Sequence, residues 1–320
     1  MPDDERTGLP YHLIHQGGRP GRWRPFLGVV LLATAFILVV PLLVQLGFAL
    51  GYAVTGRDVV ASSRRLLDLD DPTPAGLAYL NLAIAGAIPV AWLLNRFLHG
   101  LRPGWLASVR PRIRWGWLGL CLGLAMIALL ATLVVSAMVP QTVEGTEVGG
   151  GVNEMTTTMR DFLLVVAFLT PLQAAGEEYA FRGYLTQAFG GAFGRAWIAV
   201  LVPAVLFALA HGGQSAPVFF DRFAFGIVAG LAVVLTGGLE AGIAMHVLNN
   251  WLAFGIALAY GDMASTLNPV GGTWWSIPVT LTQSLVYLGL VVWAARRLGV
   301  RTTTQTPAGP GVLVAREGLV

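Results

Sequence analysis

The stretch WLGLCLGLAMIALLATLVVSAMV, residues 117–139, runs for 23 residues without a charged side chain. A helix needs about 20 apolar residues to cross the roughly 30 Å hydrocarbon core of a bilayer. Apolar and polar residues do not alternate here as they do in the strands of a membrane β-barrel. We therefore expect residues 117–139 to form a transmembrane helix.

The rest of the chain has the same character, since 55% of its 320 residues are hydrophobic and only 12% are charged. Seven further apolar segments are long enough to be read as spans: Phe26–Val54, Leu77–Leu94, Phe162–Phe189, Trp197–His211, Phe219–Leu235, Ala241–Tyr260 and Ile277–Ala295. The sequence thus predicts an all-α, polytopic membrane protein with about eight transmembrane helices.

The two ends of the chain are more polar than its middle. Residues 1–25 lack the charged start, apolar centre and small-residue cleavage site of a signal peptide, and we interpret them as a polar tail. Residues 298–320 are rich in threonine and proline and are expected to form a flexible tail. The predicted membrane-embedded domain is therefore 26–297, with its core at about 160–260.

All 20 basic residues are arginine, a bias typical of a GC-rich, bacterial genome. The net charge of +3 gives no reason to expect nucleic acid as a partner. With eight spans, fifteen arginines fall on the side of both termini, and the other side receives Arg57, Arg64, Arg65, Arg160 and Arg222. Since positive residues are retained in the cytoplasm, both termini are predicted to be cytoplasmic in a multi-pass cell-membrane protein.

The fourth span contains charged residues in the segment AAGEEYAFRGYL, residues 174–185. Charged residues within a membrane are costly, face the interior of the bundle and are by default functional. Glu178 and Arg182 have the i,i+4 spacing of a helical ion pair, which offsets the cost of each charge. Glu177 points about 100° away from Glu178 and is free to face a cavity in the bundle interior.

Two histidines, His211 and His246, lie in or beside the later spans, and Asn250 shares a helix face with His246. The helical rise of 1.5 Å per residue brings these side chains and Glu177 from three helices to one polar patch. A carboxylate beside a histidine can take a proton from water and return it to a leaving group. A second histidine and an amide can stabilise an oxyanion. This combination indicates a peptidase without a serine or cysteine nucleophile, and Cys121 is interpreted as a packing residue.

Three short motifs resemble those of a known family. EEYAFR at 177–182 is similar to EExxxR, FALAH at 207–211 to FxxxH, and HVLNN at 246–250 to HxxxN, in the order found in the CPBP family of CAAX prenyl proteases and bacteriocin-processing proteins. The resemblance implies an intramembrane glutamic endopeptidase without a metal or other cofactor. It also implies that Glu177 and His211 activate water, while His246 and Asn250 stabilise the oxyanion.

Other functions remain open at this stage. The same residues could form a zinc metalloprotease, although HExxH is absent. GQSA at 213–216 with His246 faintly resembles a rhomboid-type serine protease, but the second glycine is missing. A non-catalytic membrane scaffold or a bacteriocin-immunity protein is a further alternative. For an enzyme, Glu177 and His211 lie roughly 20 Å along their helices, so the expected partners are the lipid bilayer and a membrane-associated, possibly lipidated, peptide or protein substrate.

Overall fold

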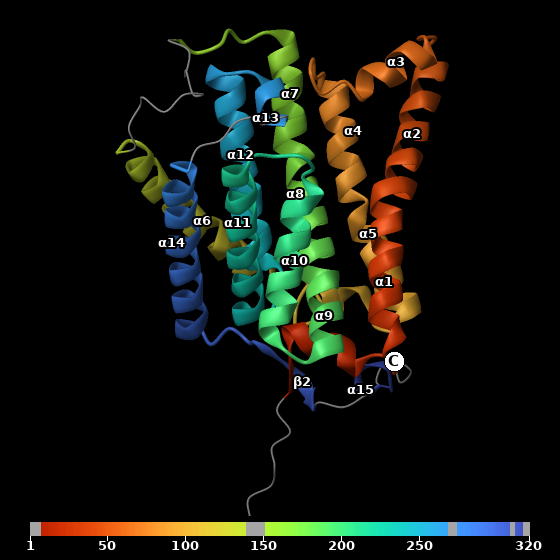
Figure 1. The fold of residues 1–320 in the computed structure, drawn as a ribbon, viewed down its shortest axis with the longest axis vertical. Helices are drawn as coiled ribbons and strands as arrows, with labels where there is room; N and C mark the ends of the chain where they lie inside the picture. The colour runs from red at the N-terminus through yellow and green to blue at the C-terminus, as the bar shows by residue number, and fades with distance from the viewer. Residues whose placement is uncertain (1–7, 139–150, 268–273, 308–310, 316–320) are drawn as a thin grey trace, which may run out of the picture.

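A computed structural model describes residues 8–138, 151–267, 274–307 and 311–315 as an upright bundle of helices (Figure 1). Within these residues, seven helices are long and apolar enough to cross a membrane: Trp23–Val54, Pro74–Leu98, Trp115–Ser136, Thr157–Phe193, Ala216–Thr236, Glu240–Tyr260 and Ile277–Arg297. The remaining predicted span is a shorter apolar helix, α10 (Ala196–Ala210). The prediction of an all-α, polytopic membrane protein is confirmed.

Several spans consist of consecutive helical parts. The first three spans are α1 (Trp23–Thr34), η2 (Ala35–Val39) and α2 (Val40–Val54); α4 (Pro74–Ala85), α5 (Ala87–Leu93) and η3 (Leu94–Leu98); and α6 (Trp115–Ser136). The fourth comprises α7 (Thr157–Phe168), α8 (Thr170–Glu177), η5 (Glu178–Leu185) and α9 (Thr186–Phe193). After α10 follow α11 (Ala216–Thr236), α12 (Glu240–Tyr260) and α14 (Ser276–Arg297).

Short elements close the two ends of the bundle. At one end lie α3 (Val59–Leu66) and α13 (Met263–Leu267), and at the other lie β1 (Gly8–Pro10), η1 (Tyr11–Gly17), η4 (Pro103–Leu106), β2 (Thr303–Pro307) and α15 (Val312–Ala315) (Figure 1). We call the end with α3 and α13 the α3 end of the molecule. The end with the two strands is called the β end.

The helix α12 occupies the centre of the bundle, where it packs against α6, α8 and α11. In the most apolar 18-residue stretch of α12, 56% is buried inside the protein, whereas the corresponding share for the first span is 17%. The first span instead exposes Ile37, Leu42 and Leu50, as expected for a helix that faces lipid. Polar residues on α12 therefore lie in the protein interior.

The fourth span changes its winding where it carries the two glutamates. Pro171 stands in the first turn of α8, where its missing N–H is tolerated, and separates α8 from α7. From Glu178 to Leu185 the chain then forms a π-helix, and the N–H of Thr186 bonds the carbonyl of Phe181, five residues back. Such wide turns occur frequently at functional sites.

The predicted tails are folded where the structure describes them. β1 pairs antiparallel with β2, and η1 buries Tyr11 and Ile14 completely. The expectation of a polar tail before residue 26 and a flexible tail after 297 thus differs from the structure at 8–17 and 303–307. The reason is that β1 pairs with β2, about 295 residues away, and η1 packs against α9, contacts that local composition does not reveal. Residues 1–7, 308–310 and 316–320 of the two tails lie outside the described residues.

Candidate active site

Four charged side chains from two spans meet in the interior. Glu178 Oε1 accepts hydrogen bonds from Arg182 Nη1 at 3.0 Å and from His246 Nδ1 at 2.9 Å. The other ring nitrogen of His246, Nε2, lies 3.2 Å from Glu177 Oε2. With both carboxylates ionised, the ring donates from both nitrogens and carries a positive charge, and the four charges then sum to zero. Such neutralisation is what a charged group in a membrane interior requires.

The ion pair between Glu178 and Arg182, expected from their spacing, is present and fully enclosed, with side-chain exposures of 0% and 1%. The guanidinium carbon of Arg182 lies 4.1 Å from the ring centre of Phe207 on α10 and 5.6 Å from that of Phe225 on α11. Aromatic faces at these distances attract the cation. Arg182 is therefore held by one carboxylate and two aromatic rings.

A glycine on α12 allows the close approach of Glu178. A Cβ added at Gly242 would stand 2.4 Å from Glu178 Oε2 and 3.2 Å from its carboxyl carbon. Gly242 lies one helical turn before His246, so the same face of α12 supplies the gap and the ring. The absence of a side chain at Gly242 thus leaves space for the Glu178 carboxylate between the fourth span and α12.

Beside this cluster is a cavity of about 310 Å³. Four of the residues expected from the sequence line it, namely Glu177, His211, His246 and Asn250, whereas Glu178 and Arg182 do not. A water molecule occupies about 30 Å³ of liquid volume, so the cavity has room for water and part of a substrate.

His211 follows the last residue of α10. Its Nδ1 lies 2.8 Å from the carbonyl oxygen of Phe207, and because a carbonyl only accepts, Nδ1 carries a hydrogen. In the neutral ring Nε2 is then an acceptor. The 15 residues of α10 span about 22 Å, less than the hydrocarbon core. His211 and the turn after it therefore lie at membrane depth, where irregular backbone is tolerated beside a cavity.

Asn250 forms no hydrogen bond with His246 in the described part of the chain. Its amide donates instead to Gln173 Oε1 on α8 at 2.9 Å. Since both ring nitrogens of His246 face glutamates, the arrangement differs from the expected pairing of His246 with Asn250 around an oxyanion. Both side chains nevertheless line the same cavity.

Sequence reasoning overlooked several polar residues that line the cavity: Gln173, Asp221, Arg222 and Asn249. Gln173 lies four residues before Glu177 and therefore on the same helix face, a signal that could have found it. Asp221 and Arg222 stand near the start of an apolar span, where any charge suggests function. Arg222 donates to Gln214 Oε1 at 2.6 Å, in the turn that follows His211.

The geometry also bears on the alternatives. Among the described residues, no three His, Cys, Asp or Glu side chains are arranged to hold a metal ion. Ser215 precedes α11, and its hydroxyl has no hydrogen-bond partner within the described part of the chain, so it forms no Ser–His pair with His246. Cys121 is fully buried on α6.

Comparison with known proteins identifies the segment that carries the candidate site. Residues 159–252 match the family model described as type II CAAX prenyl endopeptidase Rce1-like. This segment is similar to the Rce1-like family. It contains Glu177, His211, His246 and Asn250, and the resemblance predicted from the three motifs is confirmed. Similarity of this segment to a protease family, together with the apolar helices, supports a membrane-embedded peptidase.

The likeness extends beyond the Rce1-like segment. The chain is 26% identical over 275 residues to the uncharacterized protein YyaK of Bacillus subtilis (strain 168), an alignment that covers 81% of this chain and 90% of YyaK. No solved structure matches the chain.

Proposed function

We propose that this protein is an intramembrane endopeptidase of the glutamic type, which hydrolyses a peptide bond of a membrane-associated protein or peptide. The observation that carries the proposal is that Glu177 and His211 line one cavity at membrane depth, each oriented by a fixed contact. His246 orients Glu177, and the carbonyl of Phe207 orients His211. Both side chains thus present an acceptor to the same water.

In the proposed reaction, Glu177 acts as the general base. One carboxylate oxygen stays on His246, and the other takes a proton from water as the water oxygen attacks the carbonyl carbon of the scissile bond. The acceptor Nε2 of His211 holds the second hydrogen of that water. As the C–N bond breaks, Glu177 returns the proton to the leaving nitrogen. A positioned base of this kind accelerates a reaction by about 10²–10⁴-fold.

The negative charge that develops on the carbonyl oxygen needs a donor. Asn250 has two amide hydrogens and uses one on Gln173, so the second is available to an oxyanion in the cavity. His246 was expected to share this role. Its contacts with both glutamates favour a positioning role instead, in which it fixes the orientation of Glu177.

The proposed orientation follows the distribution of arginine. Near the β end lie Arg19, Arg22, Arg24, Arg96, Arg102, Arg110, Arg112, Arg114, Arg195, Arg296, Arg297 and Arg301, and at the α3 end lie Arg57, Arg64, Arg65 and Arg160. The positive-inside tendency favours a cytoplasmic β end and therefore cytoplasmic termini. The residues that line the cavity include Thr266 of α13, at the α3 end, and Thr280 in the first turns of α14. In this orientation the substrate enters the cavity from within the membrane or from the non-cytoplasmic side.

A cleavage assay in liposomes tests the proposed function. The purified protein is given one scissile sequence in two forms, as a soluble peptide and with an attached acyl chain. We expect cleavage of the anchored form and little of the soluble form, because an anchored chain can enter from the bilayer. Equal rates for the two forms would show that the membrane route is unnecessary.

A second arm of the same assay addresses the metal alternative. A strong zinc chelator is expected to leave the rate unchanged, since the proposed base acts on water directly. Loss of cleavage with chelator and recovery with added zinc would favour a metalloprotease. Failure of both substrate forms, with the protein folded, would favour a non-catalytic scaffold or immunity protein.

A further inference from the structure

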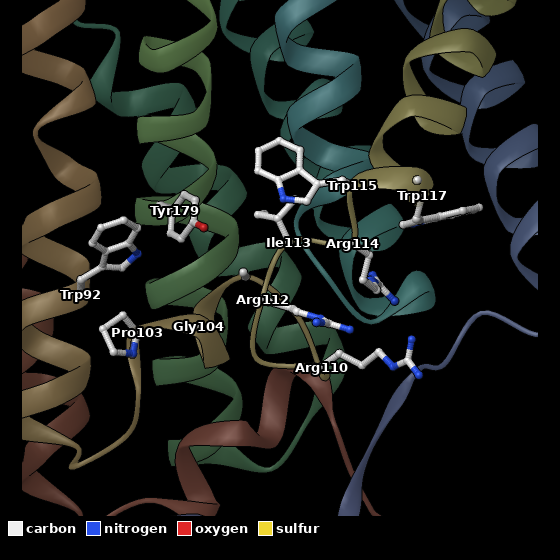
Figure 2. Close-up of a pocket in the computed structure, with 12 residues that line it drawn as sticks. Trp92, Pro103, Gly104, Arg110, Arg112, Ile113, Arg114, Trp115, Trp117 and Tyr179 are labelled. Atoms are coloured by element: carbon white, nitrogen blue, oxygen red, sulfur yellow. The ribbon is translucent and has the colours of Figure 1, made fainter. Parts of the chain in front are cut away.

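A second cavity, of about 610 Å³, opens at the β end between α5, the loop that leads into α6, and η5 (Figure 2). Trp92, Pro103 and Tyr179 lie on one side of it, and the loop with Arg110 and Arg112 lies on the other (Figure 2). Tyr179 forms the inner wall, where its ring packs edge-on against Trp92 at 6.1 Å. The cavity therefore combines aromatic and cationic walls.

The two loop arginines are not neutralised by the protein. Among the described residues, no carboxylate lies within ion-pair distance of the guanidinium groups of Arg110 or Arg112, and both side chains are exposed. Arg114 provides the contrast, because it donates to both carboxylate oxygens of Glu240, at 2.9 and 2.7 Å, and to the carbonyls of Thr236 and Arg301. Arg114 is thus a structural residue, and the positive charge left for a ligand belongs to Arg110 and Arg112.

Other donors face the same space. The cavity is lined by the first residues of α6, Trp115, Gly116 and Trp117. Their backbone N–H groups have no carbonyl partner within the helix, because the helix begins at these residues. The N-terminus of a long helix favours an anion.

We propose that this cavity binds the phosphate headgroup of an anionic phospholipid. Arginine matches phosphate oxygens with paired donors, and basic pockets between transmembrane helices are suited to anionic headgroups. Trp92 and Trp115 are 41% and 75% exposed, in the position that tryptophan takes at the membrane–water interface.

The outer face of α6 favours a lipid over free phosphate. From Gly116 in the cavity, an exposed face continues at helical spacing through Leu120, Ile127, Leu130 and Val134. An added Cβ at Gly116 or at Gly123 on the same face would meet nothing within 4 Å. A phospholipid with its headgroup in the cavity can therefore lay its acyl chains along α6, which a soluble anion cannot do.

The proposed lipid site is separate from the proposed catalytic cavity. Glu177 lines one cavity and Tyr179 the other, so the two lie on different sides of the same stretch of the fourth span. Variants of Arg110 and Arg112 therefore leave the catalytic groups unchanged.

The test is a lipid titration of the full chain in detergent, followed by its thermal unfolding midpoint and by native mass spectrometry. We expect phosphatidylglycerol to raise the midpoint and to remain bound, whereas phosphatidylcholine and inorganic phosphate do neither at the same concentration. The double variant Arg110→Gln/Arg112→Gln should bind phosphatidylglycerol about 30-fold more weakly, since each arginine near a membrane surface contributes roughly fivefold.

The matched control is Arg296→Gln/Arg297→Gln, which removes two exposed arginines near the β end but outside the cavity. It should retain most of the affinity for phosphatidylglycerol. An equal loss in the two double variants would show only general attraction to surface charge and would overturn the site. Equal stabilisation by inorganic phosphate would overturn the lipid as the ligand.

Discussion

Gly242 determines how closely α12 approaches the buried carboxylate of Glu178. Because an added Cβ would stand 2.4 Å from Glu178 Oε2, Gly242→Ala must displace either the carboxylate or the helix. We expect this variant to lose peptidase activity and to unfold at a lower temperature. Gly255→Ala on the same helix is the control, since its Cβ would meet nothing within 4 Å. If Gly242→Ala retained full activity, the close contact would be of no consequence.

Arg182 tests the supporting role of the ion pair. Arg182→Ala leaves Glu178 buried with one partner fewer, and breaking a buried pair lowers the free energy of unfolding by about 3–5 kcal/mol. Arg160→Ala removes an exposed pair with Asp161 and should change stability by less than about 1 kcal/mol. Thermal or denaturant unfolding in detergent measures both. A well-folded but inactive Arg182→Ala would instead make Arg182 part of the chemistry.

Individual contacts in the candidate site show how much of it could be predicted from the sequence. The pair Glu178–Arg182 follows from a spacing of four along one helix and could be predicted. The contact of His246 with Glu178 joins residues 68 positions apart and depends on how α12 is rotated against the fourth span. Spacing brings both helices to one patch but does not fix that rotation, so the bridging position of His246 could not be predicted.

At the scale of elements, η1 docks against the bundle through two stacked histidines. The rings of His15 and His99 lie 3.8 Å apart, and His99 Nε2 lies 2.8 Å from the hydroxyl of Tyr184. Burial, with a smaller effect of the nearby Arg24, lowers the pKa of His99 to about 4. Burial and the proximity of His99 also hold the pKa of His15 well below its usual value. Both rings are therefore neutral at neutral pH.

This arrangement predicts a loss of stability in acid. Because the pKa of His99 is about 4 in the folded state and near 6.5 when unfolded, the unfolded chain binds more protons within that window. Stability is therefore independent of these groups above about pH 6.5 and falls as the pH is lowered toward 4. The thermal midpoint should drop between pH 7 and pH 5 in the parent and by less in His99→Gln, which does not titrate. An identical drop in both proteins would contradict this explanation.

Element boundaries show a second limit of sequence reasoning. Hydropathy predicts each span because the bilayer sets its length. The π-helical winding of η5 and the docking of η1 depend on contacts with distant segments, such as the bond from the Tyr11 hydroxyl to the carbonyl of Leu106. The sequence predicted α10 as a span. In the structure this helix is short, and the consequence is that His211, which follows its last residue, lies at membrane depth.

At the scale of the whole molecule, the proposed orientation can be tested with single cysteines. The native Cys121 is fully buried, so it gives little background with a membrane-impermeant thiol reagent. Asp70→Cys lies at the α3 end and Gln305→Cys at the β end, both exposed. In intact cells we expect labelling of Asp70→Cys only, and labelling of both after the membrane is opened. The reverse pattern would place the termini outside the cytoplasm.

The central claim is that Glu177 activates the water that cleaves the substrate, and the most direct measurement is the single-turnover cleavage rate of Glu177→Gln. The assay uses an acylated peptide in liposomes, and Glu154→Gln, at an exposed glutamate that does not line the cavity, serves as the control. Gln keeps the size of the side chain but cannot take a proton. We predict a rate at least about a hundredfold below that of the parent, with a similar unfolding midpoint, while Glu154→Gln retains the parent rate. A Glu177→Gln rate within roughly twofold of the parent would contradict the mechanism, because a missing general base should lower the rate far more.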